Sequence, residues 1–93
     1  MFFENEIVEN MAIEKLKREI EKLINDSSFK KVELKNRVLN VINFDLDYNI
    51  DIVYSVASDY MLVFKNRKTN KTIIVLYAEN EDSIMDILKQ NIL

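Results

Sequence analysis

The chain has 93 residues, a formal charge of −3 at pH 7, 48% hydrophobic residues and 31% charged residues. This length suffices for one hydrophobic core, and the balance of apolar and charged residues is ordinary for a globular protein. The sequence contains no glycine, proline, cysteine, histidine or tryptophan. It therefore cannot form a histidine-based nucleophile system, the usual nitrogen–sulfur zinc site or a glycine-rich phosphate-binding loop.

The same composition bears on location. The absence of cysteine fits a reducing cytoplasm. The longest apolar run, residues 73–78, is far shorter than the roughly 20 residues of a membrane-spanning helix. Residues 1–4 lack the basic and apolar regions of a signal peptide. We expect one cytoplasmic α+β domain over residues 1–93, with no membrane partner.

The first half of the chain begins with an amphipathic pattern. Apolar residues recur at three- and four-residue steps from Ala12 to Ile24, which predicts a helix over residues 4–26. Residues 29–43 fit either a second helix or a strand. A helix is favoured, because a strand there would have to bury Asn36, Arg37 or Asn40.

Even positions of residues 44–56 are apolar, and odd positions are polar except Val53, a period of two that is typical of a half-buried β-strand. Residues 57–59 then form a three-residue hairpin loop. The expected register pairs apolar residues with one another and places one carboxylate opposite one ammonium group. The pairs are Val56 with Tyr60, Tyr54 with Leu62, Ile52 with Phe64, and Asp51 with Lys65.

A turn over residues 67–70 leads into a third strand, residues 71–78. Its expected partners in the preceding strand are Phe64 for Ile73, Leu62 for Val75 and Tyr60 for Tyr77. A last helix, capped near Asn80, runs over residues 81–91. Its buried residues are expected to be Ile84, Ile87, Leu88 and Ile92.

The predicted fold class is α+β: one or two N-terminal helices, a three-stranded antiparallel β-meander and a C-terminal helix. The helix–three strands–helix order is similar to the topology of double-stranded RNA-binding domains. That family has a lysine-rich start to its last helix, whereas this chain has Asn80-Glu81-Asp82-Ser83, which would repel phosphate. The sequence therefore assigns no family.

The second face of the meander is the candidate interface. It is too apolar to face solvent, so a helix of the same chain or another molecule must cover it. Carboxylates of the first strand lie at its margin. The candidate interface residues are Val53, Met61, Val63, Ile74, Leu76, Asp45, Asp47 and Asp51.

The favoured hypothesis is a small non-catalytic protein-binding module, an inhibitor or adaptor, whose partner is a larger protein. A homodimer that covers the second face is compatible with it. The abundance of Asn, Ile and Lys indicates an AT-rich genome, such as that of a bacterium or its phage or mobile element. From such a source, an acidic inhibitor of a host nucleic-acid enzyme, for example an anti-CRISPR or anti-restriction protein, would be a special case.

Two alternatives stay open. A nucleic-acid-binding domain would use Lys65, Arg67, Lys68 and Lys71, although the mild net negative charge and the lack of an interleaved aromatic residue weigh against it. A metal-dependent hydrolase would use Asp45, Asp47, Asp51 or Glu33, the last within the spacing Glu33-Leu34-Lys35. Because no neighbouring element supplies further ligands, we expect no catalytic residue, metal or cofactor.

Overall fold

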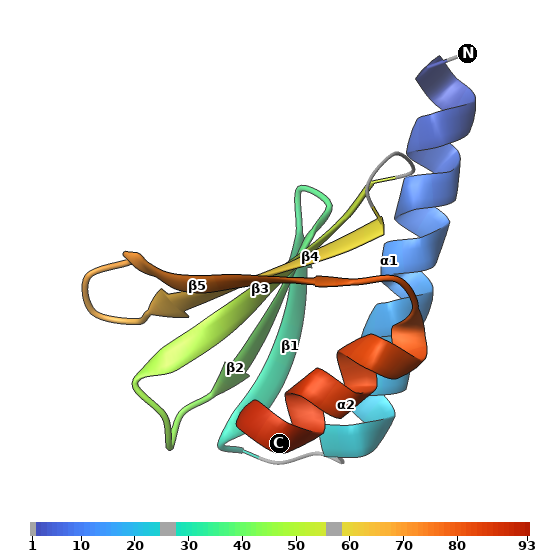
Figure 1. Cartoon of the computed structure of the whole chain (residues 1–93). Helices are drawn as coiled ribbons and strands as arrows, with labels where there is room; N and C mark the ends of the chain where they lie inside the picture. Colours follow the sequence, from blue (N-terminus) through green and yellow to red (C-terminus); the bar gives the residue numbers. More distant parts are fainter. Residues whose placement is uncertain (1, 25–27, 56–58) are drawn as a thin grey trace.

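The computed structural model describes residues 2–24, 28–55 and 59–93, and it has an α+β fold (Figure 1). The chain forms one helix, a five-stranded antiparallel meander in the order β1-β2-β3-β4-β5, and a second helix. The expectation of two helices flanking an antiparallel sheet is confirmed, but the sheet has five strands instead of three. The elements are α1 (Phe2–Ile24), β1 (Lys30–Lys35), β2 (Val38–Asn43), β3 (Tyr48–Ser55), β4 (Asp59–Asn66), β5 (Thr72–Ala78) and α2 (Glu81–Asn91).

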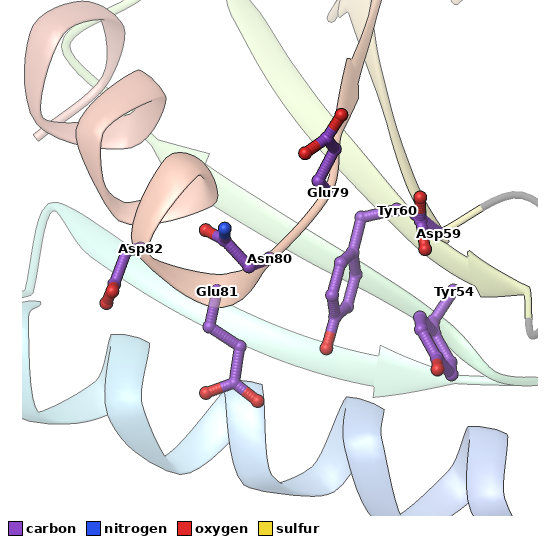
Figure 2. Close-up of a pocket in the computed structure, with 7 residues that line it drawn as sticks. All are labelled: Tyr54, Asp59, Tyr60, Glu79, Asn80, Glu81 and Asp82. Atoms are coloured by element: carbon purple, nitrogen blue, oxygen red, sulfur yellow. The ribbon is translucent and has the colours of Figure 1, made fainter.

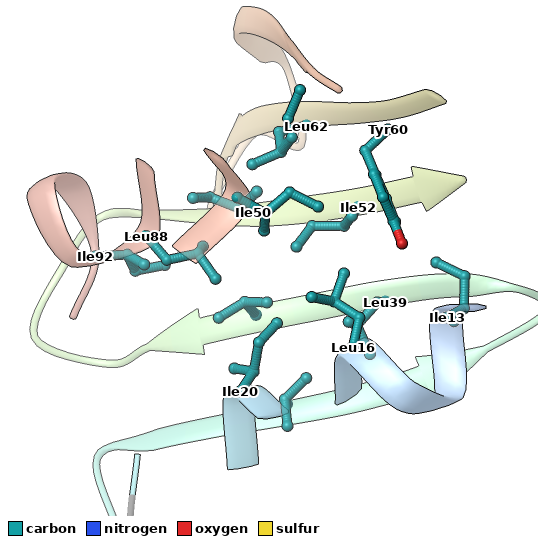
Figure 3. Close-up of a cluster of buried hydrophobic side chains, with 14 of the residues drawn as sticks. Ile13, Leu16, Ile20, Leu39, Ile50, Ile52, Tyr60, Leu62, Leu88 and Ile92 are labelled. Carbon is teal, nitrogen blue, oxygen red and sulfur yellow. The ribbon is translucent and has the colours of Figure 1, made fainter. Parts of the chain in front are cut away.

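Both helices lie on the same side of the sheet, which we call the helix face (Figure 1). The apolar stripe of α1 buries Ile13, Leu16 and Ile20 against the strands, and α2 adds Ile84 and Leu88 (Figure 3). Burial of each such side chain stabilises the fold by roughly 1.5–3 kcal/mol before entropy is counted. The strands supply the other half of this core: Val32, Leu39, Val41, Ile50, Ile52, Tyr60, Leu62, Phe64 and Ala78.

The second helix expected over residues 29–43 is wrong, because this segment forms the β1–β2 hairpin. Asn36 and Arg37 make its turn, and both have positive φ, 52° and 63°. Positive φ at both central residues is typical of a type I′ turn, whose twist matches that of the flanking strands. The turn and the far side of the sheet thus accommodate the polar residues: Asn36 and Arg37 are exposed, and Asn40 points away from the core.

The first long strand starts later than expected. Residues 44–47 form the β2–β3 turn, and β3 begins at Tyr48. The buried Asn43 holds this turn and the end of α2 together: its side-chain amide donates to the carbonyl of Ile92 at 2.7 Å, and its side-chain oxygen accepts from the backbone N–H of Asp45 at 3.0 Å. Tyr48 adds a hydrogen bond from its hydroxyl to the carbonyl of Asn91 at 2.5 Å.

The β3–β4 hairpin has a different register from the one expected. Tyr54 lies opposite Tyr60, Ile52 opposite Leu62 and Ile50 opposite Phe64, a shift of two residues. Residues 57 and 58 of the expected loop lie outside the described part of the chain, and Asp59 is the first residue of β4. Because side chains alternate with a period of two, this shift keeps each residue on its expected face.

The β4–β5 pairing shifts by one residue, with a larger consequence. Lys65 and Thr72 pair in the expected register, but an irregularity between Phe64 and Lys65 then adds one residue to β5, so Phe64 lies opposite Ile74. A one-residue slip moves every later side chain to the other face. The expected pairs Phe64–Ile73, Leu62–Val75 and Tyr60–Tyr77 are therefore replaced by Phe64–Ile74, Leu62–Leu76 and Tyr60–Ala78.

The C-terminal helix begins and packs as expected. Asn80 is its N-cap, and the side-chain oxygen accepts a hydrogen bond from the backbone N–H of Ser83 at 2.9 Å. Of the four residues expected to be buried, Ile84, Leu88 and Ile92 belong to the core and Ile87 packs against it partly exposed.

The turn at Arg37 gives a first prediction. A β-branched residue is strongly disfavoured at positive φ, whereas Asn tolerates it. We expect the free energy of unfolding of Arg37→Val to be about 1–2 kcal/mol lower than that of Arg37→Asn, measured by urea denaturation. Both variants lose the ion pair of Arg37 with Glu9, 3.6 Å apart, so their difference isolates the backbone preference. Equal stabilities would contradict a left-handed turn here.

Candidate functional site

The sheet face opposite the two helices, the open face, is the candidate site. The registers place Val38, Val53, Met61 and Tyr77 in one row across four strands, with Val63 and Val75 in the next row. None of these side chains belongs to the core cluster: Tyr77 is 70% exposed, and the other five are half-buried. Neither α1 nor α2 packs over this side in the described part of the chain (Figure 1).

Three polar side chains at the middle of the open face neutralise one another. The Lys65 ammonium lies 3.1 Å from one carboxylate oxygen of Asp51, and the Asn40 amide donates a hydrogen bond to the other. The Asp51 and Lys65 side chains are only 18% and 29% exposed. The open face is therefore an apolar surface with a paired, nearly neutral centre.

The expected interface residues divide between the two faces. Val53, Met61 and Val63 lie on the open face, whereas Ile74 and Leu76 lie on the helix face because of the slip in β5. Sequence reasoning missed Val38, Asn40, Ile42, Val75 and Tyr77. Neither Val38–Asn43, which has apolar residues on both faces and a buried Asn43, nor the continuous apolar run of β5 carries a sequence alternation that could assign a face.

The expected acidic row does not form one surface. Asp45 and Asp47 are exposed in the β2–β3 turn at one end of the sheet, while Asp51 is paired on the open face. Glu33 lies on β1, where the Lys31 ammonium 2.8 Å away hydrogen-bonds to its carboxylate and lowers its pKa. Among residues 2–24, 28–55 and 59–93, no group of three or more acidic side chains could hold a metal ion.

The basic residues of the second hairpin also separate. The Arg67 guanidinium donates to the backbone carbonyls of Asn43 at 2.6 Å and Tyr48 at 3.3 Å, and its backbone N–H donates to the carbonyl of Asp47. Arg67 thus braces the β2–β3 turn from within the molecule. Lys65 is paired with Asp51, and only Lys68 and Lys71 are exposed.

The Phe44 ring contacts two cations, which the sequence did not predict. Its ring centroid is 5.1 Å from the Arg67 guanidinium and 5.4 Å from the Lys31 ammonium. Both distances suit cation–π contacts. These residues are far apart in the sequence and meet only because the β2–β3 and β4–β5 turns lie at the same end of the meander as the start of β1.

A hollow of about 400 Å³ lies at the other end of the sheet, between the start of α2 and the β3–β4 hairpin (Figure 2). Burial and the neighbouring Glu81 carboxylate raise the pKa of Tyr60 to about 12. Glu81 and Asp82 stand in the first turn of α2, where negative charge stabilises the helix dipole. The lining residues are Tyr54, Asp59, Tyr60, Glu79, Asn80, Glu81 and Asp82.

Comparisons with known proteins give no further guide to the site. The sequence matches no family model, and neither a curated protein nor a solved structure shows significant similarity to it. Neither of the described helices combines the length and apolar character that spanning a membrane requires.

The contribution of Arg67 to stability can be compared with that of its neighbour Lys68. Arg67→Ala removes a charged donor from two backbone carbonyls, so we expect the free energy of unfolding to fall by about 2 kcal/mol. Lys68→Ala, one residue away and exposed, should change it by less than about 0.5 kcal/mol. Urea denaturation of both variants gives the comparison, and equal effects would show that Arg67 does not brace the turn.

Proposed function

We propose that this protein is a small non-catalytic protein-binding module, an inhibitor or adaptor, that docks on a larger protein through its open face. The observation that carries the proposal is the one-sided packing of the sheet. Two helices cover one face, and the other presents rows of apolar side chains. Contiguous exposed apolar surface on a folded chain commonly marks an interaction site.

The make-up of the open face supports a protein partner. Interface centres are depleted in unpaired charge and enriched in aromatic residues and methionine. Here Met61 and Tyr77 share a row of the open face, and Asp51 and Lys65 are already paired. A partner could thus cover the centre without burying an uncompensated charge, which would cost several kcal/mol. On β1, Lys31, Glu33 and Lys35 lie in register with this face and supply a polar rim.

The size of the face suits a modest interface. Five strands about 4.8 Å apart, each six to eight residues long at about 3.3 Å per residue, span roughly 20 by 25 Å. The side chains project from this plane and add accessible surface. The area of the face thus approaches the roughly 800 Å² that each partner of a standard complex buries. An inhibitor that mimics the phosphates of nucleic acid is a less direct fit, since Asp45 and Asp47 lie at one end of the sheet and the Asp51 carboxylate is paired with Lys65.

The proposal predicts that one charge on the open face abolishes binding. Val53 lies between Val38 and Met61 on the open face, so Val53→Glu would bury an unpaired carboxylate in the complex. We expect at least about a tenfold loss of the partner recovered by the tagged full-length chain from lysate of its native host, quantified by mass spectrometry.

The matched control is Val8→Glu on α1, the helix that covers the opposite face, where the parent side chain is 48% exposed. It should retain the partner, and circular dichroism should show that both variants fold. Met61→Gln, which keeps the side-chain size, provides a second open-face variant should Val53→Glu unfold. Undiminished capture by folded open-face variants would refute docking through this face.

A second candidate, binding of single-stranded nucleic acid, is favoured by the aromatic residues at the basic end. Phe29 and Phe44 are 59% and 47% exposed, and the backbone N–H of Phe44 donates to the carbonyl of Phe29 at 2.7 Å. Bases stack on such aromatic side chains while lysines contact phosphates. Lys31 and Lys68 lie at the same end of the sheet.

This candidate has its own readout. If it holds, Phe44→Ala should weaken binding of a fluorescent single-stranded RNA or DNA at least about fivefold by anisotropy, and affinity should fall steeply with salt. Val53→Glu should leave that affinity unchanged. No anisotropy change at about 50 mM salt would eliminate the candidate.

A further inference from the structure

We propose that β5 pairs antiparallel with β5 of a second copy of the chain, about a two-fold axis at Val75, so that two sheets join into one. The proposal concerns the edge of the sheet and does not depend on docking through the open face. It rests on three observations: the chemistry of the two edges, the self-complementary sequence of β5, and an apolar hollow beside it.

The two edge strands differ sharply. β1 carries charged residues at four of its six positions, and charge on an edge discourages pairing with other chains. β5 has no charged residue from Thr72 to Ala78, yet Ile73, Ile74 and Tyr77 are 59%, 49% and 70% exposed. A long apolar edge that presents unpaired backbone groups is a template for a further strand.

The sequence of β5 complements itself. In an antiparallel pair centred on Val75, the apolar residues of the strand face one another: Val75 with Val75, Ile74 with Leu76, and Ile73 with Tyr77. Thr72 and Ala78 end the strand, and Lys71 and Glu79 flank it, so an ammonium group and a carboxylate come near each other beyond both ends of the pair. Opposite charges directly across an antiparallel pair stabilise it, and like charges there destabilise it.

Neighbouring registers lack this match. Backbone groups of a strand point outward at every second residue, so the register can change only in steps of two. One step sets Lys71 against Tyr77, and the opposite step sets Ile73 against Glu79. The irregularity in β5 precedes Ile74, and the central pairs of the proposed register lie in the regular part of the strand.

An apolar hollow lies beside this edge on the helix face. It measures about 250 Å³ and is lined by Tyr48, Phe64, Ile73, Ile74, Leu76 and Asn91. In the proposed register, Ile74 and Leu76 of the second copy add their side chains on this same face. The second copy would thus bury the apolar residues that the first leaves exposed.

Sedimentation equilibrium of the full chain tests the proposal. The parent should show the mass of two chains. Val75→Lys, which sets two ammonium groups opposite each other at the axis, should raise the dimer dissociation constant at least about tenfold. Val38→Lys, the same substitution three strands away on the open face, should leave it unchanged.

Charge reversal tests the register of the proposed β5–β5 pair. Lys71→Glu and Glu79→Lys should each raise the dissociation constant about tenfold, because each turns two attractive pairs into two repulsive ones. The double variant should restore the parent value, and circular dichroism should show that all variants fold. Two results for single chains would overturn the proposal: a monomeric parent at the highest soluble concentration, or a dimer that Val75→Lys does not weaken. Equal weakening by Val38→Lys, or a double variant that fails to restore dimerisation, would also overturn it.

Discussion

Burial on a single side of the sheet is the constraint on which the rest of this structure depends. Both helices of the described residues pack on the same face, so the fully buried residues Leu16, Leu39, Ile52 and Leu88 belong to one apolar layer. A sheet of five strands packed this way is stable because one covered face supplies a core. Because both helices pack on one face, no described element covers the second face or the two edges of the sheet.

The position of α2 depends on a few polar contacts at one end of the sheet. The side chain of the buried Asn43 donates a hydrogen bond to the Ile92 carbonyl, and the Tyr48 hydroxyl donates one to the Asn91 carbonyl. The Arg67 guanidinium donates to the Asn43 carbonyl, at the start of the β2–β3 turn. The buried Asn43 favours one arrangement in particular, since another would leave its side-chain amide without partners. The arginine that the sequence placed in a phosphate-binding patch thus proves to be part of the frame that sets the helix against the sheet.

The sequence predicted those elements whose patterns were unambiguous. The stripe from Ile13 to Ile20, the alternation in β3 and the cap at Asn80 each indicated one structure, and each was found. The β1–β2 hairpin was missed because its turn uses Asn36 and Arg37, whereas the usual signal for positive φ is glycine, which this chain lacks.

The candidate site was predicted in part for a related reason. Val53 could be assigned to the open face from the alternation in β3, and Met61 and Val63 from the expected pairing of β4 with β3 across the hairpin. The faces of β5 could not, because one extra residue near Ile73 changes the register and leaves no trace in an all-apolar run. Contacts between distant residues, such as Phe44 with Arg67, depend on the register of the whole meander and lie beyond any local pattern.

The open face and the β5 edge together constrain how this protein can associate. Pairing at β5 would bring two open faces into one continuous surface of ten strands, since Val75 and Tyr77 lie on that face at the very edge. A surface doubled in this way would suit a symmetric partner or one with two equivalent sites, and its affinity would gain from the second contact without any new chemistry. The charged β1 edge would then form both outer margins of the assembly, where Lys31, Glu33 and Lys35 limit further strand addition. The distribution of charge between the two edges would thus favour a closed pair over an open chain of sheets.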